Sequence, residues 1–173
     1  MLSHAKEKQF IECFRNNDYG CFDEFYELTS RQIYFTAFSI LKDSNLAQDI
    51  MQDTYVTFLE KIDSYIIGSN IFAYLTVIAR NKSINLYNKS KQVVFDEEKL
   101  VNVPSSEWES SNEVKEILSY LDSQIEREIV VYHVLIGYKF KEIADILQEP
   151  QGTVLWRYNK AMKTLRVRVK EYE

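Results

Sequence analysis

The chain has 173 residues, 46% of them apolar, and contains only four glycines and two prolines. Tight turns in sheet proteins rely on such residues, so their scarcity argues against a β protein and predicts an all-helical one. The net charge of −5 argues against a general nucleic-acid coat protein. The acidic excess lies in the middle of the chain: residues 96–113 carry −5, whereas residues 1–95 and 114–173 carry −1 and +1.

The start of the chain and its cysteines indicate the cellular compartment. The sequence MLSHAKEKQF lacks the apolar segment of a signal peptide, and no apolar run reaches the length that spans a membrane. Cys13 and Cys21 form neither a CxxC pair nor part of a histidine cluster, so free thiols in a reducing compartment are expected. We therefore expect a cytoplasmic protein without a metal ion or another cofactor.

Helical spacing predicts four helices in residues 1–95, at about 5–16, 21–41, 46–62 and 71–89. The third can be capped by Asp43 or Ser44. Its buried face consists of the apolar positions and one threonine: Ala47, Ile50, Met51, Thr54, Tyr55, Phe58 and Ile62. Its opposite face carries Asp49, Gln52, Asp53, Val56 and Glu60. Such an acidic stripe with one valine favours docking on a basic helical partner; the alternative is an ordinary solvated face.

The fourth predicted helix has a polar face suited to nucleic acid. Tyr74, Asn81, Asn85 and Asn88 recur along it, on another face than the apolar residues that include Leu75. Asparagine can hydrogen-bond to a base edge, and a tyrosine ring can stack on an unpaired base. Basic residues that suit phosphate contacts surround this face: Arg80, Lys82, Lys89 and Lys91. The alternative is a polar face that meets only water.

Residues 96–113 show no helical period and hold Pro104, several serines and six acids, which is typical of a linker. Trp108, within this linker, can pack on a neighbouring domain or insert into a partner. The acids can mimic a nucleic-acid backbone or serve only as a solubilising tether.

Residues 114–173 predict a helix-turn-helix. A capping-box pattern, Ser123 to Glu126, precedes an apolar helix that Gly137 ends. A short helix at 139–147 and the break QEPQG follow, and Thr153 is the expected N-cap of a last helix reaching about Lys170. The apolar faces of these two helices are expected to pack on each other: Ile143, Ala144, Ile146 and Leu147 on the first helix, and Val154, Tyr158, Ala161 and Leu165 on the second.

The exposed face of the last helix is basic. Six basic residues and no acid lie between Arg157 and Lys170, so this helix can neutralise phosphates in a major groove. Leu155 and Trp156 interrupt this face with apolar side chains, which can contact thymine methyl groups or pack against a protein partner. We favour DNA because Lys160 and Lys163 share the face. A merely solvated basic helix is the alternative.

Several segments resemble a known family. The pattern EIADIL…PQGTV…R…KA…L resembles region 4 of bacterial sigma factors, which reads the −35 promoter element. The segment LAQDIMQDTYVTFLEKIDSY resembles the polymerase-binding helix of region 2, and FAYLTVIARNKSINLYNKSK resembles the helix that reads the −10 element. The resemblance covers about residues 20–170 in the family's order, and the short layout is similar to the extracytoplasmic-function (ECF) group.

The resemblance implies an all-α fold of two small helical domains: region 2 in residues 1–95, the acidic linker in 96–113, and region 4 with its helix-turn-helix in 114–173. The implied partners are core RNA polymerase, through its largest-subunit clamp helices and its flap, promoter DNA, and an anti-sigma factor. The residues implied in polymerase binding are Asp49, Gln52, Asp53, Val56 and Glu60.

The resemblance also implies two sets of DNA contacts. Those expected at the −10 element, including a loop at 64–70 that holds a flipped base, are Tyr65, Ser69, Asn70, Tyr74, Arg80, Asn81, Lys82, Asn85, Asn88 and Lys89. Those expected at the −35 element are Gln151, Thr153, Leu155, Trp156, Arg157, Asn159, Lys160 and Lys163. The chain departs from the family at Asn85, where many members carry Asp, at Lys139, which replaces Ser or Thr, and at Leu155 and Trp156. These departures leave the preferred promoter sequence open.

The sequence contains no nucleophile–base pair, metal-ligand cluster or Gly-rich phosphate loop, and His133 stands alone on an apolar helix where packing is expected. We therefore expect a non-enzymatic initiation factor that recognises −35 and −10 elements and helps melt the −10 region. The alternative is a sigma-like decoy that binds an anti-sigma factor without initiating transcription. A free-standing helix-turn-helix regulator is less favoured because it leaves residues 20–95 unexplained.

Overall fold

The structure, a computed structural model, describes residues 3–93 and 112–170, in which every regular element is a helix. The N-terminal group contains α1 (His4–Arg15), α2 (Phe22–Leu41), α3 (Ser44–Glu60), the short 3-10 helix η1 (Ile62–Ser64) and α4 (Ile71–Val93). The C-terminal group contains α5 (Asn112–Ser119), α6 (Gln124–Val130), its continuation η3 (Val131–Ile136), α7 (Phe140–Leu147) and α8 (Gln151–Lys170). The all-α prediction is confirmed. The expected linker up to residue 111, with Trp108, lies outside the described residues.

The helix ends follow local chemistry, with two corrections to the sequence predictions. Asp43 caps α3 as predicted, because its carboxylate accepts hydrogen bonds from the amides of Asn45 and Leu46, at 2.8 and 2.9 Å. Ser123 precedes α6 as expected, but its side chain makes no capping hydrogen bond. Thr153 was wrongly predicted as the N-cap of α8. The helix begins at Gln151, three residues before the start that a Thr153 cap would give, and the carbonyl oxygen of Pro150 already accepts the Thr153 amide at 2.9 Å.

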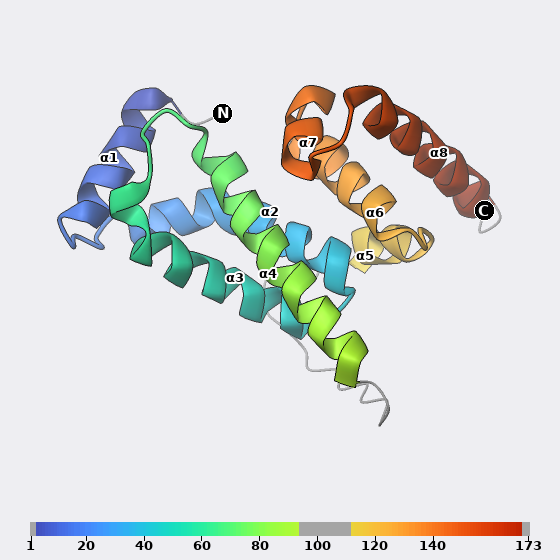
Figure 1. Ribbon diagram of the computed structural model, residues 1–173, viewed down its shortest axis with the longest axis horizontal. Coiled ribbons are helices and arrows are strands. Elements are labelled where there is room, and N and C mark those ends of the chain that lie inside the picture. Colours follow the sequence, from blue (N-terminus) through green and yellow to red (C-terminus); the bar gives the residue numbers. More distant parts are fainter. Residues whose placement is uncertain (1–2, 94–111, 171–173) are drawn as a thin grey trace.

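An aromatic cluster holds the N-terminal group together. The Phe25 ring of α2 lies 5.3 Å from the rings of Phe10 in α1 and Phe58 in α3, measured between centroids. All three side chains are fully buried. The predicted apolar face of α3 packs into this cluster, which fixes α3 with its other face toward solvent. Figure 1 shows α4 crossing α2, with α3 running back below α2; both helices contact α2.

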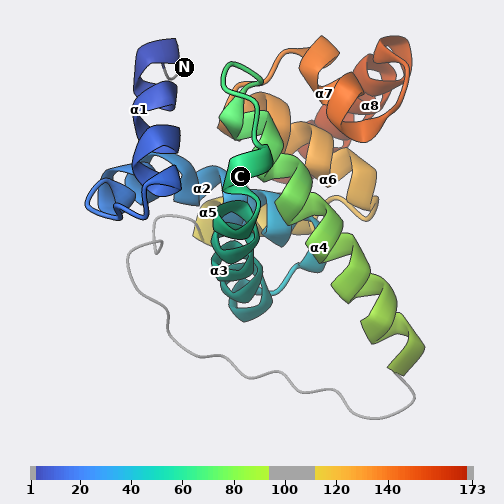
Figure 2. The same ribbon diagram turned by 60° about the vertical axis from the view of Figure 1, so that its left-hand side comes forward.

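The two groups close on each other, an arrangement that the sequence left open. Their apolar residues form one continuous core, in which α6 and η3 pack on α2 and α7 contacts α4 (Figures 1 and 2). Arg127 of α6 is 4% exposed, and its guanidinium donates to the Ser39 carbonyl of α2 at 2.8 Å. The same side chain donates to the carbonyls of Leu121 and Asp122, so it ties α6 both to α2 and to the preceding loop.

The helix-turn-helix of the C-terminal group has the predicted core. Val154 and Ala161 of α8 are fully buried against the apolar face of α7. Gly137 ends η3 with a φ of 86°, a left-handed conformation that glycine adopts without steric cost. His133 is packed, as expected, with its ring stacked on that of Phe140 at 4.2 Å. These contacts fix α8 at the surface of the group.

Candidate nucleic-acid interface

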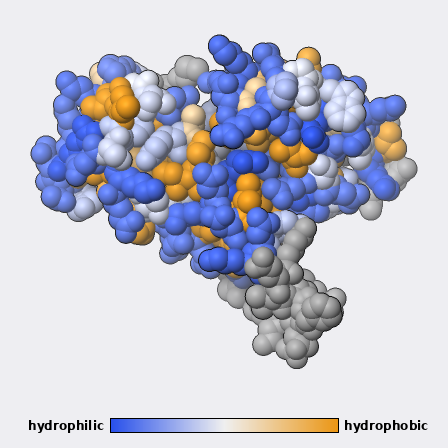
Figure 3. Space-filling model, viewed as in Figure 1, coloured by the Kyte–Doolittle hydropathy of each residue, from blue (hydrophilic) through white to orange (hydrophobic). Residues whose placement is uncertain are grey.

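The predicted polymerase-binding residues form one exposed face of α3. Asp49, Gln52, Asp53, Val56 and Glu60 are all exposed, because the helix buries its opposite face in the aromatic cluster. Val56 is 55% exposed, an isolated apolar side chain among acidic and amide groups. The surface drawn in Figure 3 is mostly hydrophilic, with hydrophobic residues in small separate patches. The α3 face therefore offers acidic groups around a small apolar centre.

The predicted base-reading residues of α4 lie along its exposed side. Asn81, Asn85, Asn88 and Lys89 are exposed, and their spacing places them along consecutive turns of the helix. Lys82 is half-buried and its ammonium lies 3.8 Å from the Asp53 carboxylate of α3. The amide face of α4 thus adjoins the acidic face of α3 in the same helical group.

The loop between η1 and α4 places its predicted residues in two different environments. Ser69 and Asn70 are exposed, and the Asn70 side chain accepts the Ala73 amide at 3.3 Å, which starts α4. Tyr65, in contrast, is 3% exposed, and its hydroxyl group donates to the Glu7 carboxylate. Burial raises the pKa of Tyr65 well above its usual value, and the bond to Glu7 adds to the rise. The Tyr65 ring therefore supports the loop from inside and does not reach the surface.

Tyr74 and Ile66 complete this loop region. The Tyr74 ring of α4 is half-buried and lies 5.1 Å from the Tyr65 ring. Ile66 is 75% exposed, although nothing in the local sequence pattern singled it out. Its neighbours in sequence, Tyr65 and Ile67, turn inward, so Ile66 is the apolar side chain that this loop presents to solvent.

Arg80, predicted to contact DNA, is engaged by the C-terminal group. Its Nε lies 2.6 Å from the Oε2 of Glu128 in α6, whose side chain is fully buried. Gln124 and Tyr132 also donate to the Glu128 carboxylate, at 3.0 and 3.3 Å. Next to this pair, the hydroxyl groups of Thr76 and Tyr138 lie 3.0 Å apart. In the closed arrangement, the charge of Arg80 is therefore neutralised by a carboxylate rather than exposed to a phosphate.

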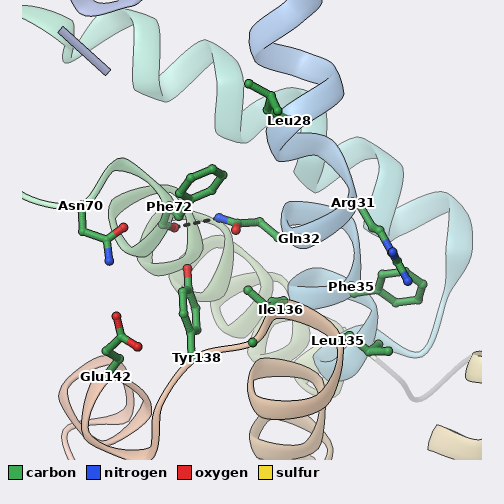
Figure 4. Close-up of a pocket in the computed structure, with 11 residues that line it drawn as sticks. Leu28, Arg31, Gln32, Phe35, Asn70, Phe72, Leu135, Ile136, Tyr138 and Glu142 are labelled. Carbon is green, nitrogen blue, oxygen red and sulfur yellow. Dashed lines mark hydrogen bonds between the residues drawn. The ribbon is translucent and has the colours of Figure 1, made fainter. Parts of the chain in front are cut away.

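A pocket of about 260 Å³ lies where the two groups meet. Figure 4 shows Gln32 of α2, Asn70 at the start of α4, and Tyr138 and Glu142 of the C-terminal group around it. The Gln32 amide donates to the Phe72 carbonyl at 2.8 Å, which closes one wall. A neighbouring groove shares Asn70 and Glu142 and adds Asp145 of α7. Two acidic side chains of α7 thus stand beside the loop and first turn of α4.

The predicted −35 face of α8 combines exposed and half-buried residues. Gln151, Asn159 and Lys163 are exposed, whereas Thr153 and Arg157 are half-buried. Leu155 and Trp156 are 42% and 60% exposed, so both apolar side chains face outward as predicted.

Two basic residues of this face have acidic partners nearby. Lys160 lies 2.7 Å from the Glu126 carboxylate of α6, and its ammonium is 5.8 Å from the centre of the Trp156 ring. Arg157 lies 3.1 Å from the Glu149 carboxylate, which precedes α8.

In residues 3–93 and 112–170, no cluster of three or more His, Cys, Asp or Glu side chains is arranged to hold a metal ion. Within the same residues, no helix has both the length and the apolar character needed to cross a membrane.

Comparisons with known proteins agree with this geometry. Residues 25–93 match the family model of sigma-70 region 2. The ECF RNA polymerase sigma factor SigM of Bacillus subtilis (strain 168) is 28% identical over 153 residues, covering 83% of this chain and 93% of SigM. The ECF RNA polymerase sigma factor SigW of the same organism is 24% identical and covers 95% of this chain and 97% of SigW.

A solved structure extends the similarity to the whole fold. The sigma factor RpoE from Bartonella quintana, in complex with the anti-sigma factor NepR, superposes with a TM-score of 0.69 at 25% identity. The superposition covers 86% of this chain and 96% of RpoE. Residues 25–93 thus match sigma-70 region 2, and over most of its length the chain is similar in sequence and in fold to ECF sigma factors.

Proposed function

We propose that this sigma factor directs core RNA polymerase to specific promoters and begins transcription by recognising −35 and −10 elements. It acts as a binding subunit: α3 docks on the clamp helices of the largest polymerase subunit, α4 and the loop before it hold the melted −10 region, and α8 enters the major groove at the −35 element. The observation that carries this proposal is the exposed amide face of α4 beside the exposed acidic face of α3, within the segment matched as region 2.

The composition of the α3 face supports docking on a basic helix. Asp49, Asp53 and Glu60 supply negative charge that steers association. Exposed ion pairs contribute only about 0 to 1 kcal/mol each, so apolar contact at Val56 adds to the affinity. The amide of Gln52 provides a hydrogen bond of defined direction at the centre of this face.

Promoter binding requires the two helical groups to separate. In the closed arrangement Arg80 is paired with Glu128, and Glu142 and Asp145 flank the loop that precedes α4. These carboxylates occupy the side of region 2 that would meet DNA phosphates, and like charges repel. Separation exposes Arg80 and the loop together, so the closed state is the form unable to bind a promoter.

An anti-sigma factor is the proposed regulatory partner. The RpoE structure contains such a partner, NepR. In this chain, a partner that binds both helical groups would stabilise the closed state and keep Arg80 paired with Glu128. Release of that partner would allow the groups to open on the polymerase.

Run-off transcription with purified core polymerase on a fragmented genomic library tests the proposal. The wild type is compared with Asp49→Lys/Gln52→Ala, and with Glu27→Lys, which reverses an exposed acidic charge on α2 as a matched control. We expect promoter-specific transcripts from the wild type and the control, and their loss in the double variant. Failure of the wild type to bind core polymerase would contradict the proposal and favour a decoy that only binds an anti-sigma factor.

A further inference from the structure

Helix α1 lies against the loop that joins η1 to α4, and it makes charged contacts there that its own packing does not require (Figure 1). It precedes residues 25–93, the part matched as region 2. Phe10 and Phe14, 0% and 2% exposed, already anchor α1 in the aromatic cluster. The polar contacts of α1 with the loop are therefore additional to the apolar contacts that anchor this helix.

Arg15 binds η1 and the first residue of the loop that follows it. Its Nη2 donates to three backbone carbonyls, those of Ile62, Asp63 and Tyr65, at 3.3, 3.3 and 2.6 Å, and its Nε also reaches the Ile62 oxygen at 3.3 Å. The guanidinium group suits this task because it presents several donors in a rigid plane. One side chain thus fixes the direction of three peptide groups in η1 and the first residue after it.

Glu7 binds the middle of the loop. It is 7% exposed, and its Oε1 accepts the Tyr65 hydroxyl group and the Gly68 amide, the latter at 3.1 Å. Gly68 has a φ of 92°, and a Cβ there would lie 3.3 Å from the His4 ring of α1. The close approach of α1 therefore uses both the left-handed conformation and the missing side chain of this glycine.

These contacts determine what the loop presents outward. With Tyr65 held inside, Ile66 is 75% exposed and Ser69 and Asn70 are exposed beside it. Ile66 offers an apolar surface against the face of an unstacked base, and the two polar side chains offer hydrogen bonds to its edge. A loop fixed in advance loses less conformational entropy when the base binds, so it discriminates bases more sharply.

We propose that Glu7 and Arg15 are positioning residues for base selection at the −10 element, acting through η1 and the loop that joins it to α4, without touching the DNA. The inference rests on the proposed function and extends it to α1. It assigns to Ile66 the apolar contact with the captured base.

The test measures base preference at each −10 position, using holoenzyme reconstituted from core polymerase and full-length protein. Its template is a promoter found by run-off transcription and randomised over its −10 element. We expect Arg15→Ala and Glu7→Leu to reduce the preference at the captured base at least fivefold, with the −35 preference and core binding unchanged. Glu7→Gln keeps an acceptor oxygen for Tyr65 and Gly68, so it should retain the wild-type preference. Lys8→Ala removes an exposed charge from the same helix and serves as the control.

The outcomes separate this inference from the proposed function. Unchanged base preference in folded Arg15→Ala and Glu7→Leu would overturn the inference even if both variants melt at a lower temperature, because a purely structural role lowers stability alone. Arg15→Lys keeps the charge but cannot span three carbonyls; an intermediate preference supports the inference, and a wild-type preference overturns it. A wild type that yields no promoter-specific transcripts overturns the proposed function, and the inference with it.

Discussion

Removal of Arg80 should open the molecule. The Glu128 side chain is fully buried, and its carboxylate is neutralised by Arg80 at 2.6 Å. In Arg80→Ala, the hydrogen bonds from Gln124 and Tyr132 remain, but the buried carboxylate loses its ion-pair partner. Breaking a buried ion pair in this way costs about 3–5 kcal/mol.

The molecule can avoid much of this cost because the two partners belong to different helical groups. Separation of the groups returns Glu128 to water, so the destabilisation acts on the closed state and not on each group's own fold. A shift of about 3 kcal/mol changes the ratio of open to closed molecules by roughly two orders of magnitude, since every 1.4 kcal/mol is a factor of ten. Arg80→Ala should therefore be largely open unless docking is far more stable than this.

Small-angle X-ray scattering and amide hydrogen exchange measure the opening. We expect a larger radius of gyration for Arg80→Ala and faster exchange in α6, with Lys82→Ala as the control because its partner, Asp53, lies in the same group. Arg80→Ala/Glu128→Gln should close again, because the neutral amide leaves no buried charge: its oxygen can accept from Gln124, and its NH2 group can donate to the Tyr132 hydroxyl oxygen. A compact Arg80→Ala protein with wild-type exchange in α6 would contradict the role of this ion pair in closure.

Two further predictions concern stability. Phe25→Ala removes a fully buried ring that contacts Phe10 and Phe58, so urea unfolding should show a loss of about 3–5 kcal/mol, and a loss below about 1 kcal/mol would contradict this packing. Burial raises the pKa of Tyr138 to about 12, so between its usual pKa near 10 and that value the folded state retains a proton that the unfolded state releases. Stability should therefore fall with rising pH in this window, by up to about 1.4 kcal/mol per unit, and less steeply in Tyr138→Phe. Equal slopes for both proteins in urea unfolding would argue against this assignment.

Helical periodicity was sufficient to predict which side chains are buried wherever their position around the helix alone decides this. The predicted buried and exposed faces of α3 are confirmed, because a spacing of 3.6 residues separates Phe58 from Val56 without knowledge of any distant contact. The fold class follows from the same signal.

The sequence did not predict the surroundings of residues whose contact partner lies far along the chain. Tyr65 was expected to contact the −10 element, but its side chain is buried and its hydroxyl group donates to Glu7, 58 residues earlier. Arg80 belongs to the polar face of α4 by periodicity, yet its partner Glu128 comes from the other helical group. Local spacing carries no information about such pairs, so the sequence pattern of α1 does not indicate its contacts with the loop before α4.

The acidic partners of α8 have a consequence for the ionic-strength dependence of promoter binding. A basic side chain that meets a phosphate normally displaces condensed cations from DNA, and affinity falls with salt in proportion to the number of such contacts. Arg157 and Lys160 already have the carboxylates of Glu149 and Glu126 as counterions. For these two residues, DNA binding exchanges an internal counterion for a phosphate, and the released carboxylate must recruit a cation from solution. The salt dependence of −35 recognition should therefore be shallower than the six basic residues between Arg157 and Lys170 would suggest.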